Sequence, residues 1–174
     1  KNDICNPKIK NINDTTSNVT DKITYIRVDD AAIDLFESQY IVPNGISYNS
    51  YLVMDEKIAI METADKRKGE EWFANLEEGL EGRTPDYLIV QHMEPDHAGN
   101  IAVLMEKYPD MKVVASAKAI QMMPQFFEDT DFNGRTIAVK EGETLSLGEH
   151  TLQFFMAPMV HWPEVMVTYD QQDK

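Results

Sequence analysis

Two histidines and two carboxylic acids lie within one six-residue stretch that runs from His92 to His97. The acids are Glu94 and Asp96, and the stretch directly follows the apolar run 87–90. Imidazole nitrogens and carboxylate oxygens are common protein ligands of divalent metal ions. Four such side chains would crowd a single ion, so they could serve two metals. We interpret the stretch as a metal-binding motif.

A purely structural explanation also exists for these residues. An aspartate often caps a helix N-terminus, and neighbouring polar side chains can simply face solvent. That explanation suits an isolated Asp-His pair. It does not explain why four ligand-type residues gather directly after a buried strand, so we favour metal binding.

The elements on either side of the motif should hold it on a loop. The run Tyr87-Leu-Ile-Val90 is short, branched and aromatic, which is typical of a buried strand. After Ala98 the apolar residues recur with the period of a helix, at Ile101, Leu104, Met105 and Tyr108. The four polar side chains should therefore lie at the C-terminal end of a strand, where open α/β folds place their chemistry.

The rest of the chain predicts a mixed α/β fold. We expect strands at 23–28, 47–54, 57–61 and 112–115, with shorter ones at 136–139, 144–147 and 150–155. The segment 30–40 should be irregular or briefly helical. One helix should bury the stripe Trp72, Phe73, Leu76 and Leu80. A second helix should run from Ser116 to about Phe127, and Pro124 should kink or shorten it. Strands early, βα units in the middle and strands again indicate an αββα sandwich, cut before its final elements.

Composition limits the possible functions. The chain has 174 residues and a mass of 19.9 kDa, which fits one domain over 21–174 after a flexible polar tail at 1–20. A formal net charge of −14 argues against nucleic acid or an anionic membrane as partner. No membrane span or signal peptide is evident, and the single cysteine, Cys5, excludes an internal disulfide. These features predict a cytoplasmic protein.

The pattern H-x-E-x-D-H resembles the metal motif of the flavodiiron proteins, an oxygen- and nitric-oxide-reducing branch of the metallo-β-lactamase superfamily. Hydrolytic members typically carry His where this chain has Glu94, and a carboxylate there suits a redox iron site better than zinc hydroxide. The resemblance runs from about Ile23 to Asp170. It includes the stretches Leu35-Phe-Glu-Ser38, Ser47-Tyr-Asn-Ser-Tyr-Leu52 and Val160-His-Trp-Pro-Glu-Val-Met166.

The resemblance implies a set of metal ligands. His92, Glu94 and His161 should bind the iron nearer the flavin, and Asp96 and His97 should bind the other iron. By itself His161 would more often be a packed or capping histidine, but its Val-His-Trp-Pro context matches the next ligand of the family. The family also supplies a bridging aspartate and a last histidine, which we expect beyond the sequence given.

Four further residues have side chains that could contribute to the site: His150, Asp170, Glu62 and Asp65. His150 has no motif context, and we expect it at the surface. We also interpret Asp170 as a surface turn residue, with ligation as the lesser alternative. Superfamily relatives usually carry Asp where Glu62 aligns, so Glu62 is a departure, and its extra methylene could shift the support of the metals. Asp65 is the lesser alternative for that role.

The family resemblance implies a diiron oxidoreductase with two non-haem irons. Electrons from FMN, held on a flavodoxin-like domain, would reduce dioxygen to water or nitric oxide to nitrous oxide. A rubredoxin-type donor and a head-to-tail homodimer are the expected partners, and the chain should be a fragment of a longer one or one of two partner subunits. The alternatives are a diiron sensor of oxygen or nitric oxide without a flavodoxin domain, and a zinc hydrolase of the same superfamily.

Overall fold

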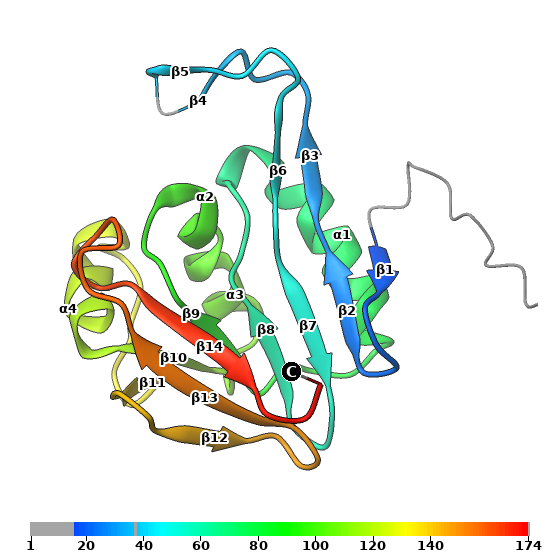
Figure 1. The fold of residues 1–174 in the computed structure, drawn as a ribbon, viewed down its shortest axis with the longest axis vertical. Coiled ribbons are helices and arrows are strands. Elements are labelled where there is room, and N and C mark those ends of the chain that lie inside the picture. The colour runs from blue at the N-terminus through cyan, green and yellow to red at the C-terminus, as the bar shows by residue number, and fades with distance from the viewer. Residues whose placement is uncertain (1–15, 37, 174) are drawn as a thin grey trace, which may run out of the picture.

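Two stacked β-sheets and a layer of helices form the part of the chain that the computed structural model describes, residues 16–36 and 38–173 (Figure 1). The larger sheet contains, in spatial order, β1 (Thr16–Asn18), β2 (Ile23–Ile26), β7 (Tyr51–Met54), β8 (Ile58–Met61), β9 (Tyr87–Val90), β10 (Lys112–Ser116) and β11 (Thr136–Val139). The smaller sheet contains β12 (Thr144–Ser146), β13 (Thr151–Met156) and β14 (Met166–Asp170). Strands β8 to β11 run parallel to one another, and the remaining pairs of both sheets are antiparallel.

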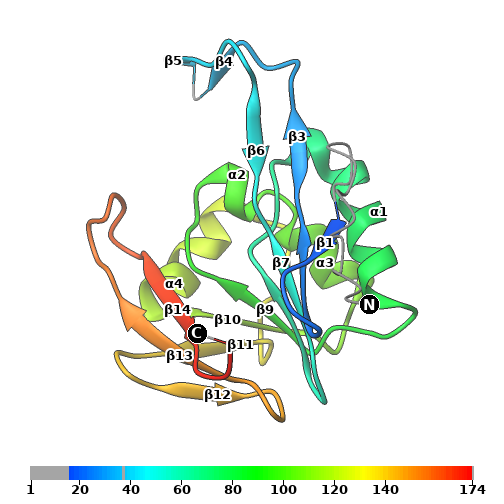
Figure 2. The same cartoon turned by 45° about the vertical axis from the view of Figure 1, so that its right-hand side comes forward.

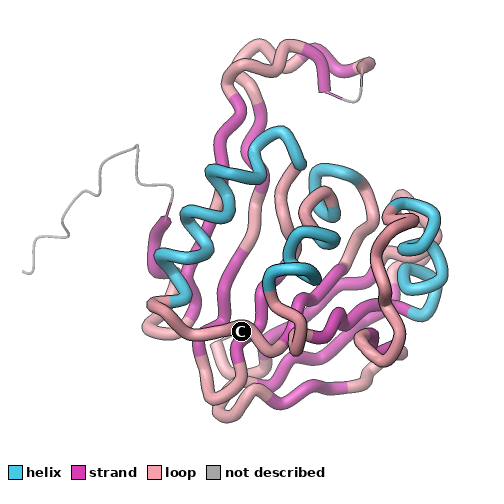
Figure 3. Tube along the Cα trace, turned by 180° about the vertical axis from the view of Figure 1, so that it is seen from behind, coloured by secondary structure: helices cyan, strands magenta, loops and turns pink. Residues whose placement is uncertain are grey.

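The helices lie on one face of the larger sheet, as Figure 3 shows from behind. They are the 3-10 helix η1 (Lys66–Lys68) and the α-helices α1 (Gly69–Leu80), α2 (Pro95–Ala98), α3 (Ile101–Lys107) and α4 (Ala117–Phe126). The smaller sheet packs on the opposite face (Figures 1 and 2). None of the helices in the described ranges has the length and hydrophobicity needed to span a bilayer.

Alternation along the central strands creates two separate cores. In β9, Leu88 and Val90 pack toward the helices, whereas Ile89 packs toward the smaller sheet. The same alternation in β10 places Val113 on the helical side and Val114 between the sheets. Both faces of these strands are therefore buried, which explains why the sequence shows continuous apolar runs there.

The predicted sandwich is confirmed in its main features. Strand β9, the parallel strand β10 and the Ser116 cap of α4 lie where the sequence placed them. The second helical layer of an αββα sandwich is not formed by the described residues. Pro124 lies inside α4, which ends at Phe126.

Several expected boundaries differ. Of the predicted tail, residues 1–15 lie outside the described residues, but Thr16–Asn18 form β1, which pairs with β2. The expected strand 47–54 is two strands, β6 and β7, interrupted at Asn49 and Ser50. The buried Ser50 hydroxyl donates to the Glu62 carbonyl at 3.1 Å.

The segment between β2 and β7 forms an arm that extends from the larger sheet (Figure 1). It pairs β3 (Val28–Asp30) with β6 (Ile46–Tyr48) and, at its tip, β4 (Leu35–Phe36) with β5 (Tyr40–Ile41). The segment expected to be irregular or helical therefore contains two very short strands. Strand β14 was not among the predicted elements.

Candidate metal centre

The motif residues lie on the loop that follows β9, as the sequence predicts. His92 and Glu94 are buried, and Glu94 is the N-cap residue of α2, a single turn that begins at Pro95 and contains Asp96 and His97. The extended conformation of Glu94 ends the loop and starts the turn. The motif thus occupies the C-terminal edge of a parallel strand, where side chains can converge from neighbouring loops.

The segment after β8 holds the motif turn in place. Thr63 donates to the His97 carbonyl through both its backbone amide, at 2.8 Å, and its hydroxyl, at 2.7 Å. The Asn100 side chain donates to the Ala64 carbonyl at 2.7 Å. A Cβ on Gly99 would lie 2.6 Å from the Pro95 carbonyl oxygen, so only glycine permits this close backbone approach.

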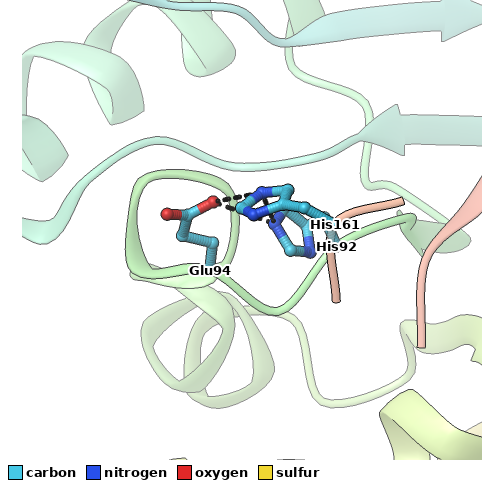
Figure 4. Close-up of side chains that lie close together, drawn as sticks. All are labelled: His92, Glu94 and His161. Carbon is cyan, nitrogen blue, oxygen red and sulfur yellow. Dashed lines mark hydrogen bonds and ion pairs between the residues drawn. The ribbon is translucent and has the colours of Figure 1, made fainter. Parts of the chain in front are cut away.

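Three ligand-type atoms converge above this turn (Figure 4). His92 Nε2 lies 2.9 Å from Glu94 Oε2 and 3.2 Å from His161 Nε2, and His161 Nε2 lies 3.1 Å from the same Glu94 oxygen. His161 comes from the loop between β13 and β14, and its side chain is 66% exposed. The cluster is thus closed on the protein side and open toward solvent.

These distances suit a bound cation. Ligand atoms about 2.1 Å from an ion and at right angles to one another are separated by about 3.0 Å, and two histidines with one carboxylate form a facial triad that suits non-haem iron. The carboxylate oxygen of Glu94 is an acceptor, so the lone pair of an unprotonated His92 Nε2 would face it unfavourably without a cation between them. The donor set therefore fits a metal at this position.

Asp96 and His97 form a second, smaller group. Asp96 Oδ2 lies 3.7 Å from His97 Nε2, while Asp96 Oδ1 is buried without a hydrogen-bond partner in residues 16–36 and 38–173. Burial raises the pKa of Asp96, and the negative charge of Glu94 raises it further. An orphaned buried carboxylate oxygen beside an imidazole also suits a cation.

Glu62 lies behind this second group. Its Oε2 is 2.7 Å from His97 Nδ1, on the ring edge opposite the Nε2 atom that faces Asp96. Burial alone would lower the pKa of His97, but the hydrogen bond and charge of Glu62, helped by Asp96 and Glu94, raise it. The alternative, Asp65, instead binds the Arg67 side chain at 2.9 Å, so the geometry favours Glu62 as the supporting carboxylate.

Glu164 was not among the site residues predicted from the sequence. Its side chain has no exposed surface, and its Oε1 atom lies 2.8 Å from His92 Nδ1. The local signal was an acid three residues after His161, but only the folded chain brings it beneath His92. The Trp162 ring also packs edge-on against the His92 ring, with centroids 5.2 Å apart.

Two expectations about residues outside the motif were wrong. His150 is only 2% exposed. Its Nδ1 lies 2.8 Å from Asp170 Oδ2, and its backbone amide donates to the buried Asp55, so its polar groups are satisfied. Asp170 is the last residue of β14 and pairs with this imidazole, so it is not a free surface turn residue. Both lie on strand ends remote from the motif.

A hollow of about 330 Å³ adjoins the two groups. It lies between the ends of the two sheets and reaches both His92 and His97. Its lining residues are Asn49, Tyr51, Met61, Glu62, Gln91, His92, His97, Val165 and Met166. A small molecule could approach both histidines from this side.

The chain has clear relatives. Residues 46–174 match the family model described as ODP family beta lactamase. The chain is 36% identical over 169 residues to a putative diflavin flavoprotein A 1 of a Nostoc species, a match that covers 96% of this chain and 29% of that protein. It is 38% identical over 152 residues to a nitric oxide reductase of Moorella thermoacetica, covering 87% of this chain and 38% of that protein.

Solved structures agree with these matches. The rubredoxin oxygen:oxidoreductase of Desulfovibrio gigas superposes with a TM-score of 0.83 at 32% identity, over 88% of this chain and 38% of that one. A flavo di-iron protein variant from Thermotoga maritima gives a TM-score of 0.81 at 29% identity, over 89% of this chain and 39% of that one. The sequence given therefore spans well under half the length of these relatives.

Proposed function

This chain belongs to the ODP family of β-lactamase-like domains, and from that premise we propose that it is the diiron domain of a flavodiiron oxidoreductase. The observation that carries the proposal is the convergence of three donor atoms, from His92, Glu94 and His161, within 3.2 Å of one another. Names of the relatives in both comparisons support the same class, since they include flavo di-iron, nitric oxide reductase and oxygen oxidoreductase proteins.

His92, Glu94 and His161 would hold one iron, and Asp96 and His97 would contribute to a second. The ring centroids of His92 and His97 are 5.3 Å apart, which leaves room for two neighbouring ions. Glu94 is the carboxylate of the first group, and its anionic oxygen favours the more oxidised iron states over a zinc-hydroxide site. The same residue therefore disfavours the zinc-hydrolase alternative.

Bound iron would supply the one-electron chemistry that reduces dioxygen to water or nitric oxide to nitrous oxide. The chain's own residues would position it and limit access to it. Glu94 is buried, whereas the His161 side chain leaves the outer side of the group open to solvent. The hollow beside His92 and His97 offers a second approach, and its volume of about 330 Å³ far exceeds what a diatomic molecule needs.

Electron delivery belongs to the same proposal. FMN on a flavodoxin-like domain, supplied by the longer chain or by a head-to-tail partner subunit, would pass electrons to the irons. A rubredoxin-type protein is the expected upstream donor, as the name of the Desulfovibrio gigas relative suggests for that protein. A cytoplasmic location is also proposed, since the chain carries a single cysteine.

The metal content of protein purified without oxygen tests the proposal. We expect about two irons per chain, or about one where the second group alone is weak, measured by elemental analysis. The iron-loaded protein should consume dioxygen or nitric oxide when supplied with a reduced flavodoxin-type donor. Stoichiometric zinc with lactamase or esterase activity would contradict the proposal, and reversible dioxygen binding without flavin-linked turnover would favour the sensor.

A further inference from the structure

Glu164 is the most completely buried carboxylate beside the proposed metal position. Its side chain has no exposed surface, and it lies on the loop between β13 and β14, three residues after His161. Its Oε1 atom lies 2.8 Å from His92 Nδ1 and accepts a hydrogen bond from the Met93 amide at 2.9 Å. Burying a carboxylate costs free energy unless neighbouring groups donate hydrogen bonds to it or carry the opposite charge. The complete burial of Glu164 therefore requires an explanation.

We propose that Glu164 is a positioning residue that keeps the proton of His92 on Nδ1 and directs its Nε2 lone pair at the metal position. The inference rests on the proposed function, because it assigns a role in metal binding to a residue outside the ligand set. An ionised carboxylate can only accept hydrogen bonds, so the His92 nitrogen that faces Glu164 must carry the hydrogen. The opposite nitrogen, Nε2, is then free to bind a cation.

The geometry on the far side of the ring agrees with this assignment. His92 Nε2 is the atom that lies 2.9 Å from Glu94 and 3.2 Å from His161. Glu94 also faces the ring, at Nε2, but its Oε2 atom lies 3.1 Å from His161 Nε2, and that second ring can donate to it. A His92 ring with its proton on Nε2 would face Glu164 with a lone pair and would lose the metal-binding atom. The two carboxylates on opposite edges of the His92 ring therefore have different roles. Glu164 orients the ring, whereas Glu94 would bind the metal.

Glu164 is itself held rigidly. The Ser116 hydroxyl donates to the Glu164 carbonyl at 2.7 Å, and the same hydroxyl caps α4 by accepting from the Ala119 amide at 3.1 Å. Two residues further on, the Met166 amide donates to the Gln91 carbonyl at 3.1 Å. The loop that carries both His161 and Glu164 is therefore fixed to the ends of β9 and β10, and a carboxylate on a fixed backbone can set the orientation of its partner ring.

A second property of the side chain separates this role from simple packing. Glu164 Oε2 is buried and has no hydrogen-bond partner among the residues that the structure describes, which therefore use only one oxygen of the carboxylate. A residue selected for packing alone could be an uncharged side chain of similar shape at lower cost. The negative charge becomes useful if a cation is bound through His92, because the carboxylate raises the basicity of the ring as a ligand.

The direct test is the tautomer of His92 in the metal-free, 174-residue chain at about pH 8, above the ordinary imidazole pKa. Long-range nitrogen–proton NMR spectra distinguish the two tautomers, and the chain has only four histidines to assign. We expect His92 with its proton on Nδ1. A native chain with the proton on Nε2 overturns the inference, and this result requires neither a variant nor bound metal.

The second test is Glu164→Gln, which keeps the shape and removes the charge. We expect its affinity for Fe²⁺ or Co²⁺, measured by chelator competition, to fall about 10- to 100-fold while the melting temperature of the metal-free protein changes little. Glu164→Asp keeps the charge and should recover part of the affinity. The matched control is Asp170→Asn, which alters a His–carboxylate pair remote from the motif, at His150, and should leave metal affinity unchanged.

The outcomes separate the two claims. Failure of the native chain to bind either metal counts against the proposed function, while the tautomer of the metal-free chain still decides the role of Glu164. A native chain that binds metal, with a Glu164→Gln affinity within twofold of native, overturns the positioning role alone. Equal losses in Glu164→Gln and Asp170→Asn would also overturn it, since they would show a general effect on stability.

Discussion

Glu62 Oε2 lies 2.7 Å from His97 Nδ1, and this pair mirrors the one that Glu164 makes with His92 at 2.8 Å. Each motif histidine thus has a buried glutamate on Nδ1 and its Nε2 turned toward another candidate ligand. The two glutamates come from opposite parts of the chain, one from the end of β8 and one from the loop before β14. The repeated arrangement indicates that each glutamate orients one histidine ring so that the Nε2 atom of that ring faces the other candidate ligands.

Glu62→Gln should weaken the second metal position selectively. The variant loses the charge that orients His97, so we expect the affinity of the weaker-bound metal to fall about 10- to 100-fold while the stronger-bound one is retained. Titration of the metal-free protein with Co²⁺, followed by visible absorption, resolves the two steps. Loss of both steps together would mean that Glu62 supports the whole edge of the sheet and not one ring.

Alanine at His92, Glu94 or His161 should each remove one donor of the three-atom cluster. We expect the bound iron per chain, measured after anaerobic reconstitution, to fall by at least about half in each variant, because the remaining donors no longer form a facial set. His150→Ala is the control, since His150 pairs with Asp170 away from the motif.

His150 is buried, so its alanine variant should melt at a lower temperature without losing iron from the folded protein. Equal iron loss in this control and in the cluster variants would show that the site has been assigned to the wrong residues. The comparison therefore requires the melting temperature and the iron content of each variant.

Gly99→Ala should destabilise the motif turn. The added Cβ would meet three backbone atoms within 3.0 Å, from Pro95, Lys66 and Ala64, and none of these can move as a flexible side chain would. We expect a loss of about 1–3 kcal/mol in the free energy of unfolding, measured by urea denaturation, together with weaker metal binding. Gly79→Ala, in α1, is the milder comparison, because its nearest neighbour is the flexible Leu52 side chain at 3.0 Å.

Asp55 lies at the end of the fold remote from the motif. We expect this residue to make the free energy of unfolding depend on pH in the acid range. It lies between β7 and β8 and accepts hydrogen bonds from the backbone amides of His150 at 2.7 Å and Glu56 at 2.9 Å, and from Lys22 at 3.1 Å. Burial by itself would raise the pKa of Asp55, but these donors outweigh burial and lower it.

A pKa lower in the folded than in the unfolded chain stabilises the protein above the unfolded value of about 3.9, and this stabilisation is lost as the pH falls through the folded value. Asp55→Asn should therefore be about 1–3 kcal/mol less stable than the native chain at neutral pH, and the difference should shrink below about pH 4. Urea unfolding of both proteins across this range measures it. A difference that stays constant down to the lowest pH would contradict the assigned cause.

The local pattern of apolar and polar residues in the sequence determined the strands and the motif loop at the centre of the fold. The apolar run Tyr87–Val90 predicted a buried strand, and the change to helical spacing after Ala98 placed the motif on the intervening loop, as the structure confirms. The strand β10 and its Ser116 cap followed from the same kind of evidence. These features depend on neighbours a few residues away, which a single sequence displays directly.

Only the tertiary structure decided which distant side chains meet. It interrupts the expected strand 47–54 at Asn49 and Ser50, where the Ser50 hydroxyl donates to the carbonyl of Glu62, the residue after β8. It buries His150 against Asp170, and it brings Glu164 beneath His92 although the two residues are 72 positions apart in sequence. Such contacts depend on the order of strands in the two sheets and on how those sheets stack, and neither periodicity nor spacing along the chain encodes that order locally.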